Sequence, residues 1–207
     1  MVAKRFSEEQ VELFSPIVDR LLTMIGAARD AFNRHSRNRL ADLQSQQGIV
    51  EQAVRDTTDQ LKSLIARKPE AETPVLIRAR SILDHLKVIG DQIGGCLTPI
   101  EQKIQGGILF SDKAVTQANF LFDQHSGIIR SMLDILKTDN DFLKKYLLEE
   151  SRKLGQACRT FATEHETRLI EGICLPQAAP IFLALLDRMG AMAQQEIKIA
   201  DLLAGTP

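Results

Sequence analysis

The chain has 207 residues, 44% of them hydrophobic, which is enough for one packed domain with its own core. A formal net charge of -1 provides no broad basic field to neutralise phosphates, which argues against nucleic-acid binding. Aromatic residues make up only 5% and tryptophan is absent, a composition typical of long packed helices, so we expect an all-α protein.

Breaks in the sequence divide the chain into helices. Proline and glycine indicate loops at 68–74, 106–107 and 172–176, and weaker breaks lie at 33–36 and 138–140. Six helices are expected, over residues 7–33, 37–67, 74–105, 111–138, 139–171 and 176–204. At a rise of about 1.5 Å per residue the longest would extend roughly 45–50 Å, which predicts an elongated bundle.

Several helix starts carry capping signals. Ser7 with Gln10 can form a capping box, Thr73 before Pro74 is a typical N-cap, and Ser111 or Asp112 can cap the fourth helix. These signals set the first residues of the expected helices.

Three helices have apolar residues at the alternating three- and four-residue spacing of a packing seam. The pattern is strongest in 74–105 and weaker in 37–67 and 176–204. In the last of these it comprises Phe182, Leu186, Met189, Ala193, Ile197 and Ala200. Antiparallel neighbours joined by short loops would bury these seams.

The sequence also contains a weak internal repeat. Residues 86–93 have a partial echo about one hundred residues later, at 186–193, and each segment closes one half of the chain. We therefore expect a single domain over 1–207, built of repeat one at about 7–105 and repeat two at about 111–204. A chance match between helical segments is the alternative.

These two segments resemble the PhoU family of bacterial phosphate regulators, in which two three-helix repeats each end near Leu-Glu-Arg-Ile-Gly-Asp. Residues 107–111, 163–174 and 182–193 are similar to the cytoplasmic PhoU-like domain of type II sodium/phosphate cotransporters. The resemblance implies a non-enzymatic regulatory or interaction module in phosphate uptake or signalling. Its partner would be a membrane phosphate transporter or signalling protein, which would place it in the cytoplasm, peripheral to the inner membrane.

The family also implies an acidic face that binds metal, formed by two acids one helical turn apart. This chain departs from the motif in both halves: Lys87 replaces the leading acid before Asp91, and Ala191 replaces the trailing acid after Asp187. Asp91 and Asp187 remain the candidate metal ligands for a divalent or iron-type ion. The competing interpretation is a solvated face with a Lys87–Asp91 ion pair and no cofactor.

No catalytic motif is present, so we predict that the chain is not an enzyme. His125 and His165 have no ligand spacing and are expected to be hydrogen-bonded boundary residues. Arg168 is expected to set the end of the fifth helix and its packing, and an anion contact from Arg168 is the alternative. The cysteines lack disulfide or zinc spacing and should be buried or half-buried inert thiols: Cys96, Cys158 and Cys174.

Two other functions stay open: a metal-binding helical bundle using carboxylates for sensing, storage or catalysis, and a purely structural scaffold. Whether the chain is a stand-alone protein or a transporter domain also stays open. The longest apolar run, 181–186, is far below the roughly 20 residues that span a bilayer, so we expect a soluble chain. Apolar positions beside the seams, Ile82, Ile89 and Phe122, are expected to be exposed and to support a homodimer.

Overall fold

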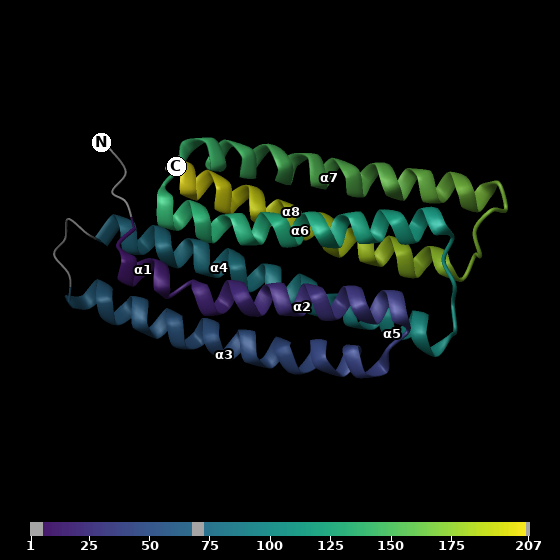
Figure 1. Cartoon of the computed structure of the whole chain (residues 1–207), viewed down its shortest axis with the longest axis horizontal. Helices are drawn as coiled ribbons and strands as arrows, with labels where there is room; N and C mark the ends of the chain where they lie inside the picture. Colours follow the sequence, from purple (N-terminus) through teal and green to yellow (C-terminus); the bar gives the residue numbers. More distant parts are fainter. Residues whose placement is uncertain (1–5, 68–72, 206–207) are drawn as a thin grey trace.

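The computed structural model describes residues 6–67 and 73–205, whose regular secondary structure is all helical with no strand, as predicted. The elongated bundle is drawn in Figure 1. The described helices are α1 (Glu8–Glu12), α2 (Ser15–Arg34), α3 (Arg37–Arg67), α4 (Thr73–Gly95), α5 (Leu97–Gln105), α6 (Asp112–Thr138), α7 (Asp141–Ile170) and α8 (Ala178–Ala204). The expected loop at 68–72 lies outside the described residues.

Two of the six expected helices are interrupted, so the described residues form eight segments. α1 ends at Glu12 and α4 ends at Gly95. Each end lies four residues before a proline, Pro16 or Pro99. Proline has no N–H to donate to the carbonyl four residues earlier, and its ring collides with that carbonyl. The first and third predicted helices therefore each divide in two.

Side-chain caps begin two helices at residues that the sequence predicted, Ser7 and Ser111, whereas Thr73, the third predicted cap, is itself the first residue of α4. Ser7 and Gln10 form the expected capping box, with Gln10 N donating to Ser7 Oγ at 3.3 Å and Ser7 N donating to Gln10 Oε1 at 3.0 Å. Ser111 caps α6 by accepting from the backbone of Ala114. Asn140 caps α7. Each cap pairs an N–H that the first helical turn leaves without an intrahelical acceptor.

Glycine ends two helices at one end of the bundle. After α7, the N–H of Ile173 donates to the carbonyl of Arg168 at 2.9 Å, which is the long bond of a Schellman motif. The motif needs a left-handed residue before Ile173, and Gly172 provides it with a φ of 72°. Gly107 provides the same conformation after α5, with a φ of 58°.

We expect Gly172→Ala to lower the free energy of unfolding by about 1 kcal/mol, because an L side chain is strained at positive φ. Urea unfolding followed by circular dichroism measures this. Gly127 is the matched control, since it lies exposed within α6 with open space around its Cα. Gly127→Ala should instead leave stability unchanged or raise it, because alanine favours helix. Equal losses in both variants would contradict the assignment.

The helices form two sets of three that lie side by side. α2, α3 and α4 with α5 pack together, as do α6, α7 and α8 (Figure 1). Contacts of α4 with α8 and of α2 with α6 join the two sets. This is the expected bundle of two three-helix units. The superposition of residues 7–105 on 111–204 stays a prediction.

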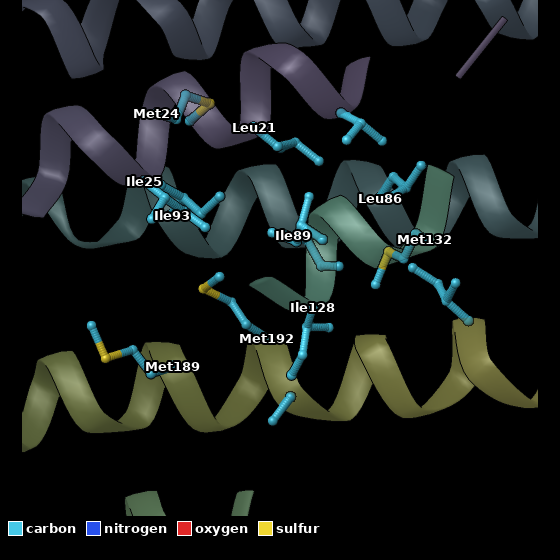
Figure 2. Close-up of a cluster of buried hydrophobic side chains, with 14 of the residues drawn as sticks. Leu21, Met24, Ile25, Leu86, Ile89, Ile93, Ile128, Met132, Met189 and Met192 are labelled. Atoms are coloured by element: carbon cyan, nitrogen blue, oxygen red, sulfur yellow. The ribbon is translucent and has the colours of Figure 1, made fainter. Parts of the chain in front are cut away.

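One hydrophobic core runs through both sets of helices. Figure 2 shows its centre, where α2, α4, α6 and α8 each contribute side chains. The labelled members are Leu21, Met24, Ile25, Leu86, Ile89, Ile93, Ile128, Met132, Met189 and Met192. The described helices include none that is long and apolar enough to cross a membrane.

The prediction that Ile82, Ile89 and Phe122 are exposed was wrong. Their exposed fractions are 1%, 0% and 4%. α4 contacts α2, α3 and α8, and α6 contacts α2, α7 and α8, so both helices are covered on several sides. Their flanks are buried along with their seams, and a homodimer would need another surface. Ile197, expected in the seam of the last helix, is only half-buried.

Candidate functional site

Asp91 lies on α4 and forms the predicted ion pair. Lys87 Nζ is 2.8 Å from Asp91 Oδ2, one helical turn away, and both side chains are partly exposed. The two charges neutralise one another, so a cation approaching Asp91 would have to displace the ammonium of Lys87. An exposed pair of this kind stabilises a helix by only a few tenths of a kcal/mol.

Asp187 lies on α8 at the side of a groove that α8 forms with α7. The groove has a volume of about 510 Å³ and is lined from α7 by Gly155, Cys158, Arg159 and Ala162, and from α8 by Leu183, Leu186, Asp187, Gly190, Ala191 and Gln194. Asp187 is the single carboxylate in this lining. Ala191 is also there, at the position where the family motif would place a second acid. Arg159 adds a positive charge, which opposes cation binding.

Asp91 and Asp187 lie on two helices that contact each other, α4 and α8. Their sequence neighbours are joined, since Arg188 Nη1 donates to Gln92 Oε1 at 3.2 Å. Asp187 also lines the groove with α7. Within the described ranges, no group of three or more His, Cys, Asp or Glu side chains is arranged to hold a metal ion.

We expect the purified protein to contain less than stoichiometric transition metal, because each half keeps one carboxylate of its motif. The double variant Lys87→Glu/Ala191→Asp restores an acid one turn from Asp91 and from Asp187, and it should raise metal uptake measured by elemental analysis after dialysis. Asp91→Asn/Asp187→Asn is the matched control and should bind less than the unmodified chain. One or more tightly bound ions per unmodified chain would contradict the degenerate-motif interpretation.

A buried polar pair joins α6 to α8 near the core. His125 Nδ1 and Glu196 Oε1 are 2.7 Å apart, and the two side chains are 1% and 0% exposed. His125 was expected at a boundary, and Glu196 was missed. The signal for Glu196 was its spacing, since it lies three residues after Ala193 and four before Ala200, in the buried stripe of α8.

A second polar group lies where α6 meets the end of α7. Arg168 Nη2 donates to Gln117 Oε1 at 3.0 Å, and Gln117 Nε2 donates to Glu164 Oε2 at 2.7 Å. The Arg168 side chain is 13% exposed and is also 3.7 Å from Glu164. Arg168 is thus engaged inside the bundle. An anion contact would compete with these partners.

His165 is fully buried beside Phe182, with ring centroids 4.7 Å apart, and neither ring nitrogen has a hydrogen-bond partner among the described residues. The expectation of a hydrogen-bonded boundary residue was therefore wrong for His165. Burial, and then the charge of Arg168, lower its pKa, so the ring is neutral.

The cysteines are buried and unpaired, as predicted. Burial raises the pKa of both Cys96 and Cys158 to about 12, so these thiols stay protonated near neutral pH. Cys158 lines the α7–α8 groove but offers no thiolate there.

The core also contains a buried amine, that of Lys103. Lys103 is 3% exposed, and its Nζ donates to the carbonyl oxygen of Phe32 at 2.8 Å. Nζ also lies 3.0 Å from His35 Nε2 and 4.9 Å from the Phe32 ring centre. Burial lowers the pKa of Lys103 to about 8. Lys103 thus links α5 to the last turn of α2. The spacing of residues in the sequence did not indicate that this amine would be buried.

Comparison with known proteins identifies the fold. Neither a protein-family model nor a curated protein sequence matches the chain. Among solved structures, PhoU from Pseudomonas aeruginosa matches with a TM-score of 0.85 and 15% identity, over 96% of this chain and 95% of that one. The chain has the PhoU fold. The phosphate transport system regulatory protein PhoU from Streptococcus pneumoniae matches with a TM-score of 0.84 and 12% identity, over 96% and 93%.

Proposed function

We propose that this chain is a non-enzymatic regulatory module in phosphate uptake or phosphate signalling. The observation that carries the proposal is the likeness of nearly the whole chain to two PhoU structures, one of them described as a regulator of a phosphate transport system.

We further propose that the partner is a membrane sodium/phosphate transporter, encoded separately or fused to this chain, and that the chain works at the cytoplasmic side of the membrane. The basis is the resemblance of residues 107–111 and 163–174 to the PhoU-like domain of such cotransporters. In the structure these two segments lie against each other, since Ser111 Oγ is 3.9 Å from Cys174 Sγ. Regulation would then act through protein contacts, with Asp91 and Asp187 as residual metal contacts at most.

The experiment is uptake of radiolabelled phosphate by cells that lack the gene, with wild-type complementation as the control. Uptake is measured in sodium medium and in medium where potassium replaces sodium. We expect loss of the gene to change the sodium-dependent component at least about twofold, and complementation to reverse the change. A change confined to the sodium-independent component would contradict the transporter assignment, and no change in either would contradict the regulatory role.

A further inference from the structure

Three connections meet at one end of the bundle, the right-hand end of Figure 1. They are the α2–α3 turn, the α5–α6 connection at 106–111 and the α7–α8 connection at 171–177. His35 Nε2 in the first lies 3.2 Å from the carbonyl oxygen of Ile108 in the second, and Ser111 in the second contacts Cys174 in the third. These three connections, with the last residue of α7, are called the loop end below.

The loop end exposes an unusual share of the large apolar side chains. Eight such side chains are exposed in the described part of the chain, and half of them are here: Leu109, Ile170, Ile173 and Leu175, with exposed fractions between 55% and 87%. Scattered apolar residues on a surface need no explanation, whereas a group of aliphatic side chains at one place indicates a binding surface.

The α5–α6 connection is anchored to the core through Phe110. Phe110 packs into the core with ring-centre distances of 5.5 Å to Phe32 and 5.8 Å to Phe182. The anchored ring leaves its neighbour, Leu109, directed to solvent at 67% exposure.

The α7–α8 connection follows the same pattern. Cys174 is buried, and its backbone N–H and that of Ile173 both donate to the carbonyl of Arg168. Ile173 and Leu175, on either side of Cys174, are exposed. Each connection therefore buries one side chain and exposes aliphatic side chains to solvent. Exposure of apolar surface to water is unfavourable, and folding of the bundle does not require it at these positions.

Positive charge lies beside these aliphatic side chains. Arg34 and Arg37, the last residue of α2 and the first of α3, are exposed on either side of the α2–α3 turn, and neither has an ion-pair partner in the described part of the chain. Lys113 is exposed at the start of α6. The acidic residues in these connections and at the helix ends next to them are Asp112 and Glu171, against Arg34, Arg37 and Lys113. Positive charge is thus in slight excess here, while the whole chain has a net charge of -1.

We propose that the loop end binds the surface of an anionic lipid bilayer, with the four aliphatic side chains entering the boundary between headgroups and acyl chains and the arginines contacting lipid phosphates. Loop tips at one end of a long bundle can meet a flat surface together, whereas a peptide ligand would need a groove. Aliphatic insertion combined with basic residues is the pattern of peripheral membrane binding. Binding of lipid requires no transporter, so it can be tested apart from the proposed regulatory function.

The test is flotation of the full chain with vesicles of phosphatidylcholine alone and of phosphatidylcholine mixed with phosphatidylglycerol. We expect binding to the mixed vesicles, weakened by added salt. Leu109→Ser/Ile173→Ser should weaken it at least about tenfold, and Arg34→Glu/Arg37→Glu should do so by a similar factor. The matched control is Phe142→Ser, which removes a 75% exposed side chain at the other end of α7 and should leave binding unchanged.

Circular dichroism confirms that each variant is folded. Absence of binding by the unmodified chain, or an equal loss in Phe142→Ser, overturns the proposal. Sedimentation velocity tests the competing occupant, a second copy of this chain. If the unmodified chain self-associates, the Leu109→Ser/Ile173→Ser variant is a monomer, and neither protein binds vesicles, then the loop end is an interface between copies instead.

Discussion

Glu196→Ala is expected to lower the free energy of unfolding by about 3 kcal/mol. Glu196 is fully buried, and its Oε1 is 2.7 Å from His125 Nδ1. Truncation removes this hydrogen bond, leaves the imidazole buried without a partner, and opens a cavity between α6 and α8. Removing one partner of a buried polar pair is generally much more costly than removing both.

Urea unfolding followed by circular dichroism at constant pH measures the loss. The double variant His125→Leu/Glu196→Leu should recover most of it, since two apolar side chains replace the pair and nothing polar is left unpaired. Lys198→Ala is the control, because Lys198 is exposed on the same helix and should change stability by less than about 0.5 kcal/mol. If the double variant is less stable than Glu196→Ala, the pair contributes net stability and this account is wrong.

The helical architecture could be predicted because it depends on local signals. The seam on the expected helix 74–105 was visible as a three- and four-residue spacing, and the caps at Ser7 and Ser111 were visible as residue types. The interruptions before Pro16 and Pro99 were predictable by the same local rule, and were missed because the apolar spacing continues across them. Local signals define a helix even when they do not settle its continuity.

Burial of helix flanks could not be predicted in the same way. Ile82, Ile89 and Phe122 lie beside seams, and a seam alone does not say how many neighbours a helix has. α4 and α6 each contact three other long helices, so these flanks are covered. The number of neighbours is a property of the tertiary arrangement, which one sequence does not contain.

In the candidate site, too, contacts within one helix were predictable and contacts between helices were not. The Lys87–Asp91 pair was predictable because the two residues are one turn apart on one helix. The surroundings of Asp187 were not, because Arg159 reaches its groove from another helix. The loop end was missed for a related reason: Ile170 and Ile173 are ordinary apolar residues in the sequence, and only the packing of their neighbours shows that they face outward.

Lys103 predicts a dependence of stability on pH. Its pKa is about 8 in the folded chain, and the ordinary value is 10.5. Between these values the unfolded chain holds a proton on this amine that the folded chain has lost, so stability rises as pH increases from about 8 towards 10.5. The gain is lost again as pH falls through about 8. Desolvation of the ammonium is the cause.

The size of this change should be about 1–3 kcal/mol, because one pKa unit corresponds to about 1.4 kcal/mol and the hydrogen bond to the Phe32 carbonyl favours the charged form and opposes the shift. Other groups also titrate in this range, so the informative quantity is the difference between the unmodified chain and Lys103→Met in urea unfolding at several pH values. Lys113→Met, which removes an exposed amine, should follow the unmodified curve. Parallel curves for Lys103→Met and the unmodified chain would mean that the buried amine keeps its ordinary pKa, and that the carbonyl and the aromatic rings around it fully offset its loss of water.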